Sequence, residues 1–274
     1  MNRALWTKAV SDAWRQLLVS VLLLTLFSWL FVWLMSRFPV GGFGIILKWL
    51  PGFVQAMVGV KLEMLATPVG QLSILYVHVV TILVCVGWAL GRGSDSVSGE
   101  IARGTMDLIL SLPVWRVTVL AAPAVVTAVG SLLLAAAVQA GTMLGLACVH
   151  FQPPPPAAAF LPGVVNLFCM TFCFTAITTL VSSWSRDRWW TIGIAAAFYI
   201  FSLIVKMVAR MWPPGKWLFG LSFLSPFEPQ ELILMRADGG RTALQYDLTL
   251  LGLGLACYVA AAVTFSRRDI PGPR

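Results

Sequence analysis

The sequence predicts an all-α membrane protein, folded as a single transmembrane domain over residues 1–274 that crosses the bilayer about six times. Apolar residue types make up 59% of the chain and charged types 11%, whereas a soluble domain carries about 25% charged and roughly 45–50% apolar residues. The charged residues stand in short groups. The runs between these groups reach the ~20 residues that a helix needs to cross the hydrocarbon core.

Six such runs follow one another along the chain. The stretch 117–185 contains no Asp, Glu, Lys or Arg and is too long for one helix. The prolines at 153–156 divide it, because proline lacks the backbone N–H and clashes inside a helix. The predicted spans are residues 16–36, 64–91, 119–148, 161–183, 189–208 and 248–266.

Residues 1–16 have a pattern of their own. Leu5, Trp6, Ala9, Ala13 and Trp14 recur at helical spacing, and polar side chains occupy the other face. We expect an N-terminal amphipathic helix that lies in the membrane interface, because its apolar face and its tryptophans favour that position. A cytosolic extension of the first span is the alternative.

The basic residues predict the orientation of the chain. An even number of spans places both termini on one side of the membrane, and a cytoplasmic location for them places most Arg and Lys residues in the cytoplasm, as is usual. We therefore expect a multi-pass protein of the cell (inner or plasma) membrane with cytoplasmic termini. The segment 210–247, which prolines break into short pieces, then lies outside the cytoplasm.

The net charge of +8 also bears on partners. Binding to nucleic acid requires a clustered basic face, whereas here the 19 Lys and Arg residues are scattered between apolar runs. This distribution favours membrane lipid as the partner of the basic side chains and argues against nucleic acid.

The chain lacks the motifs of a self-contained enzyme. It has no G-x-x-x-x-G-K-[ST] loop for a nucleotide phosphate, no H-E-x-x-H and no G-x-S-x-G. Its five cysteines form no C-x-x-C pair, and its histidines are only His78 and His150. We expect no catalytic residues, no cofactor and no metal. His78, inside the second span, is either part of a transport site or a neutral imidazole that is hydrogen-bonded to a neighbouring helix.

The loop between the second and third spans, residues 92–116, is the most informative part of the sequence. It holds three basic and three acidic residues, and Leu108, Leu112 and Trp115 recur at helical spacing. Ser98-Gly99 as a start and Pro113 as an end predict a short helix on the cytoplasmic surface. Exposed leucines and a tryptophan favour docking to a membrane or a partner over a solvated loop. We call residues 92–116 the coupling segment.

This segment resembles the membrane subunits (permeases) of type 2 ABC transporters, whose signature is approximately S-G-E-x-x-x-G-T-x-(D/E)-L-L-L-S-x-P-V-x-R. The matching residues are Ser98, Gly99, Glu100, Gly104, Thr105, Asp107, Leu108, Leu110, Ser111, Pro113, Val114 and Arg116. The order of an N-terminal helix, six spans and a broken outer segment also resembles the family. One departure is Ala121-Ala122-Pro123, where family members often carry Gly-Lys.

The resemblance implies that a separate cytosolic ABC ATPase contacts the coupling segment and hydrolyses ATP. It further implies that the permease works as an exporter with a second permease subunit, in a homodimer or a heterodimer. Glu100 and Arg103, one turn apart, could pair with each other or with the ATPase. The residues that we assign to ATPase contact or coupling are Glu100, Arg103, Gly104, Thr105, Asp107, Pro113 and Arg116.

Two alternatives remain open from the residues alone. An ion-coupled secondary transporter would need charged or unwound elements near the midplane, and the near absence of ionisable residues from the spans argues against it. A membrane scaffold without transport would use the basic ends of the chain to recruit partners.

Overall fold

The computed structural model describes residues 3–37, 62–111, 115–151, 154–235 and 239–267. Within these ranges the chain is helical and contains no strand. Six helical stretches are long and apolar enough to cross a membrane, which confirms the predicted all-α membrane fold. They are Arg3–Met35, Pro68–Ala102, Arg116–Cys148, Ala157–Trp184, Arg188–Met211 and Arg241–Arg267.

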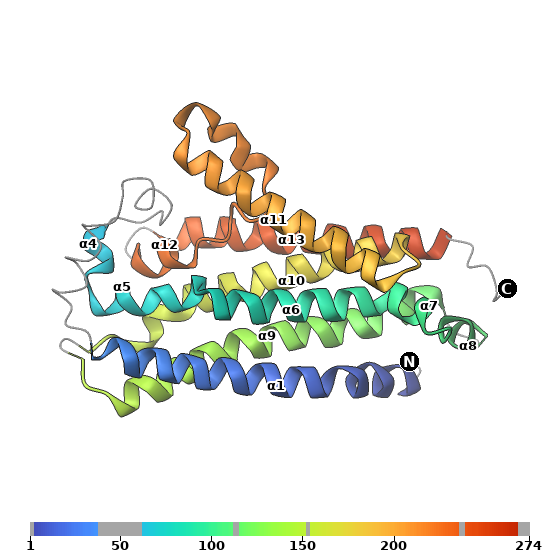
Figure 1. Cartoon of the computed structure of the whole chain (residues 1–274), viewed down its shortest axis with the longest axis horizontal. Helices are drawn as coiled ribbons and strands as arrows, with labels where there is room; N and C mark the ends of the chain where they lie inside the picture. The colour runs from blue at the N-terminus through green and yellow to red at the C-terminus, as the bar shows by residue number, and fades with distance from the viewer. Residues whose placement is uncertain (1–2, 38–61, 112–114, 152–153, 236–238, 268–274) are drawn as a thin grey trace.

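The elements follow one another in the order shown in Figure 1. The first half comprises α1 (Arg3–Met35), α4 (Leu62–Leu65), α5 (Pro68–Ser73), the 3-10 helix η1 (Ile74–Val77), α6 (Val79–Ser94), the π-helical turn η2 (Asp95–Gly99), α7 (Glu100–Ala102) and α8 (Met106–Leu110). The second half comprises α9 (Arg116–Cys148), η3 (Ala157–Phe160), α10 (Leu161–Trp184), α11 (Arg188–Met211), η4 (Pro213–Leu221), α12 (Pro229–Leu234) and α13 (Gly239–Arg267).

Helix α10 forms the centre of the bundle. It packs against α6, α9, α12 and α13, and side chains such as Leu167, Met170 and Phe174 are fully buried. The hydroxyls of Thr171 and Thr175 donate to carbonyls one turn earlier in the same helix. The central helix can therefore be polar in part without leaving buried donors unpaired.

Helices α1 and α9 lie side by side over most of their length. A Cβ added at Gly141 would lie 2.4 Å from the carbonyl oxygen of Thr25, and one added at Gly145 would lie 2.5 Å from Cβ of Val32. These distances are too short for a side chain, so only glycine fits at the two positions. Small residues four apart in this way allow two helix backbones to approach closely in lipid.

The expectation of a separate interfacial helix at residues 1–16 is wrong. The structure shows one continuous helix from Arg3 to Met35, as the alternative foresaw. Leu5, Ala9 and Ala13 are buried against the protein, and Leu5 packs in a cluster with Val97, Met106, Val119, Leu120 and Phe265. Part of the apolar face that we assigned to lipid therefore covers α9, α13 and the coupling segment, whereas Trp14 is 49% exposed.

The second and sixth spans are longer than predicted. The second helical stretch continues past Gly91 to Ala102, so the start of the coupling segment is helical. Helix α13 begins at Gly239 and not near 248, because the polar residues before 248 are helical as well. Between positions 210 and 247 the described residues comprise the end of α11, η4, α12 and the start of α13.

His78 sits at the step between η1 and α6. Its Nδ1 accepts a hydrogen bond from the N–H of Val80 at 3.2 Å and so caps α6. Its ring lies against Phe27 and Phe31, with centroids 4.9 and 5.6 Å away. A ring nitrogen that accepts a hydrogen bond carries no proton. This geometry favours the neutral imidazole of the two alternatives. The hydrogen-bond partner is Val80 in the helix that follows His78, and not a residue of a neighbouring helix as we expected.

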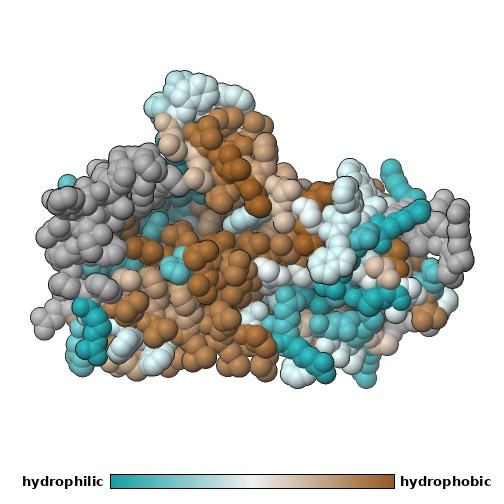
Figure 2. All heavy atoms as spheres, viewed as in Figure 1, coloured by the Kyte–Doolittle hydropathy of each residue, from teal (hydrophilic) through white to brown (hydrophobic). Residues whose placement is uncertain are grey.

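The two ends of the bundle differ. The start of α1 and the end of α13 lie at the end that carries α7 and α8, whereas α4, α5 and α12 lie at the other end (Figure 1). In Figure 2 hydrophobic side chains cover the middle of the visible face, and hydrophilic ones gather at the end that carries α7 and α8. This is the arrangement of a bilayer-spanning bundle with a polar cap.

Candidate functional site

The coupling segment begins with a π-helical turn that is held by the central helix. Ser182 of α10 accepts hydrogen bonds from the N–H of Val97 at 3.3 Å and of Ser98 at 2.9 Å. The same hydroxyl donates to the carbonyl of Ser94 at 3.1 Å. A π turn disrupts the regular backbone ladder, and such turns are frequent at functional sites. Here one serine from another helix pairs the displaced backbone groups.

Two glycines allow this turn to pack. A Cβ at Gly93 would lie 2.5 Å from Cβ of Thr178, so only glycine lets α6 approach α10 here. A Cβ at Gly99 would lie 2.5 Å from a carboxylate oxygen of Asp95. The signature glycine Gly99 therefore makes room for the Asp95 side chain.

Gly104 ends the helix and turns the chain toward α8. Its φ of 71° lies in the left-handed region that favours glycine. The N–H of Gly104 donates to the carbonyl of Ile101 at 3.0 Å, and that of Thr105 donates to Glu100 at 3.1 Å. This pair of hydrogen bonds is a Schellman motif, which pairs the last carbonyls of a helix.

The carboxylate of Glu100 is the centre of one group of contacts. Glu100 is 6% exposed. It accepts hydrogen bonds from Nη2 of Arg103 at 2.8 Å, from the hydroxyl of Thr105 and from Nζ of Lys8. The predicted pairing of Glu100 with Arg103 is therefore formed within the chain, and α1 contributes a third partner.

Asp95 is the centre of a second, adjoining group. It accepts a hydrogen bond from Nη1 of Arg103 at 2.6 Å, and lies 3.4 Å from Nη1 of Arg92 and 3.6 Å from Nη1 of Arg188. Arg92 also donates to the carbonyl of Asp12 in α1 at 3.0 Å. Partial burial opposes the charge of Arg103, but the carboxylates of Asp95 and Glu100 raise its pKa.

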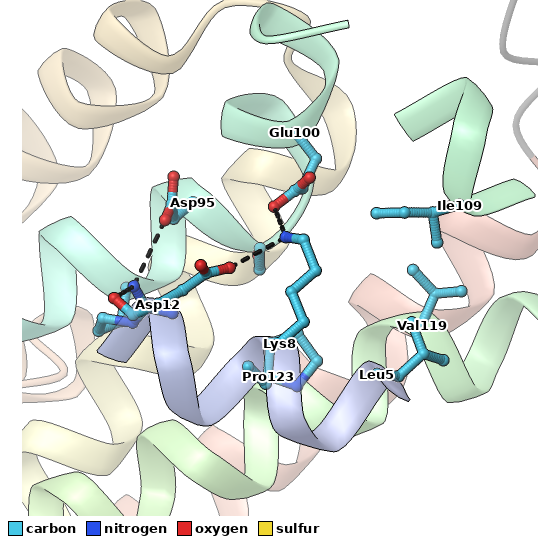
Figure 3. Close-up of a pocket in the computed structure, with 11 residues that line it drawn as sticks. Leu5, Lys8, Asp12, Asp95, Glu100, Ile109, Val119 and Pro123 are labelled. Atoms are coloured by element: carbon cyan, nitrogen blue, oxygen red, sulfur yellow. Dashed lines mark hydrogen bonds and ion pairs between the residues drawn. The ribbon is translucent and has the colours of Figure 1, made fainter. Parts of the chain in front are cut away.

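Lys8 and Asp12 of α1 lie beside Asp95 and Glu100 (Figure 3), so the side chains join α1, α6 and α7. Arg188 extends the network to the start of α11. The Asp95 and Glu100 side chains are 13% and 8% exposed. Of their cationic partners only Arg92 is buried, with 8% of its side chain exposed, so removing the Asp95 carboxylate would leave a buried guanidinium without its ion pair. A buried polar group that loses its partner costs about 1–3 kcal/mol, and more when it is charged.

The space between these residues is too small for an organic ligand. The cavity in Figure 3 has a volume of about 30 Å³ and is lined by Lys8, Asp12, Arg92, Asp95 and Glu100 together with apolar side chains. A site of this size has room for water only. Within the described ranges no group of three or more His, Cys, Asp or Glu side chains could hold a metal.

The remaining predicted residues lie apart from the charge network. The Asp107 side chain makes no hydrogen bond or ion pair with the described residues. Arg116 begins α9 and donates to the carbonyl of Ser266 at 3.3 Å. Pro113 lies outside the described residues. The structure thus brings Glu100, Arg103, Gly104 and Thr105 together, and it places Asp107 and Arg116 elsewhere.

Helix α8 shows two faces. Met106 is buried and packs with Leu5, Val119 and Phe265, with Ile109 against the same cluster. Leu108, on the other face of α8, is 70% exposed. Trp115 is not part of α8; it precedes α9 and is 84% exposed. These two belong to the helical spacing that we assigned to docking, and its third member, Leu112, lies outside the described residues.

Sequence reasoning missed most of the network. Lys8 and Asp12 come from α1, Arg188 from α11 and Ser182 from α10. None of them is close to the coupling segment in sequence. Arg92 and Asp95 belong to the coupling segment, and their spacing of three on a helix was a usable signal.

Comparison with known proteins agrees with this architecture. The family model described as ABC-2 family transporter protein matches residues 7–270. The comparison with curated proteins gave no match. The matched range runs from the second turn of α1 to beyond the end of α13, and it includes the coupling segment and its network. The chain therefore belongs to the ABC-2 family of transporter proteins.

Proposed function

We propose that this chain is the permease subunit of an ATP-driven exporter, in which a separate cytosolic ATPase moves the coupling segment. The single observation that carries the proposal is the exposed pair Leu108 and Trp115 beside a charge network that ties the segment to α1 and α11. Exposed apolar side chains on a rigid support mark protein interaction sites.

The two groups of residues have different roles in this proposal. Leu108 and Trp115, which are exposed, contact the ATPase together with Asp107, whose side chain pairs with none of the described residues. Glu100, Arg103, Gly104 and Thr105 position the segment, because their polar groups are already occupied by partners within the chain. A push on α8 is then transmitted to α1 and α11 as one body. Switching between two packed arrangements of the bundle moves the substrate.

The orientation is part of the same proposal. Both termini and the coupling segment lie in the cytoplasm, and α4, α5 and α12 lie outside it. A second permease subunit completes the transport path, and ATP binds to the ATPase alone.

An ion-coupled secondary transporter is less well supported. The only buried lysine among the described residues, Lys206, lies near the end of α11 and is 3.0 Å from Glu228. This pair connects α11 to the turn before α12 and not to the middle of the bundle.

Co-purification tests the proposal. Capture of the tagged chain from its native membrane should recover a stoichiometric P-loop ATPase, and the chain alone should hydrolyse no ATP. Trp115→Ala and Leu108→Ala should each weaken ATPase binding at least tenfold, because a tryptophan at the centre of an interface contributes about 2 kcal/mol or more. Trp217→Ala is the matched control, since Trp217 is 66% exposed on η4.

Two results would contradict the proposal. Recovery of the chain without an ATPase in repeated mild-detergent preparations would favour the secondary transporter or the scaffold. Equal ATPase binding by the Trp115→Ala and wild-type chains would remove the assigned docking surface.

A further inference from the structure

A second cavity lies at the end of the bundle away from the coupling segment. It has a volume of about 870 Å³ and lies between the end of α11 and η4 on one side and α12 and α13 on the other. Small-molecule sites have volumes of about 300–1,000 Å³. Its lining combines charged side chains with ring surfaces from Phe219 and Tyr246.

One wall of this cavity is fixed by paired charges. Glu228 lies 3.0 Å from Nζ of Lys206 and also pairs with Arg210. Lys206 donates in addition to the carbonyl of Leu224 at 2.8 Å. The side-chain oxygen of Asn166 accepts the N–H of Glu228 at 3.0 Å. These contacts tie the turn before α12 to α10 and α11, so the wall is preorganised.

Two other charges at the cavity have no such partners. Glu231 and Lys216 both line it, and neither side chain makes a hydrogen bond or an ion pair with the described residues. Burial and the neighbouring carboxylate of Glu228 raise the pKa of Glu231, although Arg210 and Lys206 partly offset this. The cavity thus holds one carboxylate and one ammonium that form no ion pair with the described residues.

We propose that this cavity binds a small zwitterion, with its ammonium group at Glu231 and its phosphate or carboxylate at Lys216. Charge-assisted hydrogen bonds at both ends select a ligand that carries both charges. The faces of Phe219 and Tyr246 suit the short alkyl linker and attract a cation. The headgroup of an ethanolamine phospholipid and a free water-soluble zwitterion share this chemistry.

Binding here needs no ATPase, so it can be tested apart from the transport proposal. The full chain in detergent is titrated with glycerophosphoethanolamine by isothermal calorimetry. Glycerophosphoglycerol, which has the phosphate and lacks the ammonium, is the comparison probe. Glu231→Gln and Lys216→Gln should each weaken glycerophosphoethanolamine binding at least tenfold. The controls are Glu63→Gln on α4 and Arg241→Gln on α13, which do not line the cavity.

A second arm identifies the source of the ligand. Native mass spectrometry of the chain from membranes that contain ethanolamine and glycerol phospholipids measures which lipid is retained. Selective retention of the ethanolamine lipid, lost in Glu231→Gln, supports a headgroup site. Binding of the soluble probe without retained lipid supports a free zwitterion. Equal binding of both soluble probes, or wild-type binding and retention by Glu231→Gln, would overturn the proposal.

Discussion

The two ends of the bundle both gather charged side chains but use them differently. At the coupling end, Asp95 and Glu100 are surrounded by donors and the space between them is about 30 Å³. At the far end, Glu231 and Lys216 have no ion-pair partner among the described residues and line a cavity of about 870 Å³. Charges that satisfy one another stiffen a segment, whereas unmatched charges around a cavity are available to a ligand.

The sharpest test of this difference is Glu100→Gln. The amide of glutamine has the same shape as the carboxylate but carries no negative charge, so Lys8 and Arg103 lose the ion pair that they share. We expect ATP-driven transport by the reconstituted complex to fall at least tenfold while the ATPase still binds through Leu108 and Trp115. Transport assays and pull-downs with the same preparations measure both.

Glu63→Gln, at an exposed position of α4, is the control for Glu100→Gln and should leave transport unchanged. If Glu100→Gln abolished ATPase binding and left the unfolding temperature unaltered, Glu100 would be a contact residue and not a positioning residue.

A smaller effect is expected from Ser182→Ala. The substitution leaves the N–H groups of Val97 and Ser98 without their acceptor in a buried place, which costs about 1–3 kcal/mol. We expect faster amide exchange in residues 94–99, measured by hydrogen–deuterium exchange. Thr175→Ala is the control, because that hydroxyl donates only within α10. Unchanged exchange in Ser182→Ala would mean that the π turn does not depend on α10.

The Lys8–Glu100 pair should contribute less. The Lys8 side chain is 40% exposed, and ion pairs at exposed positions contribute about 0.2–1 kcal/mol. A double-mutant cycle with Lys8→Met and Glu100→Gln, measured by unfolding in detergent, should give a coupling energy in that range. A coupling energy near zero would mean that α1 is not energetically linked to the network. A second cycle with Lys8→Met and Asp12→Asn is the control, because it measures the Lys8–Asp12 pair within α1.

The smallest expected effect has the opposite sign. Burial and Glu228 raise the pKa of Glu231, so the ionised carboxylate opposes folding at neutral pH. Glu231→Gln should raise the free energy of unfolding by less than about 1 kcal/mol after solvent screening. The difference in unfolding free energy between Glu231→Gln and the wild type should be complete above the raised pKa of Glu231. It should disappear as the pH falls below the ordinary pKa of glutamate. A loss of stability at neutral pH would show that Glu231 is a structural residue.

The spans and the coupling segment were predictable because both depend on local patterns. Charge-free runs reveal a membrane helix whatever packs against it, and the signature from Ser98 to Arg116 is contiguous. The network was not predictable, since Lys8 and Ser182 approach Glu100 and η2 only through tertiary packing. The helix at residues 1–16 was misplaced for a related reason. An apolar face that covers protein has the same period as one that covers lipid.

Helix α1 is long enough to connect the coupling segment to the opposite end of the bundle. At 1.5 Å per residue its 33 residues extend about 50 Å, whereas the hydrocarbon core is about 30 Å thick. Near the start of α1, Lys8 pairs with Glu100 of the coupling segment. Toward the other end of α1, Thr25 and Val32 pack directly against Gly141 and Gly145 of α9, with no room for a side chain at either glycine. Under the proposed function, we therefore expect a displacement of the coupling segment to move α1 along its length and to reach the opposite end of the bundle through the close contact with α9.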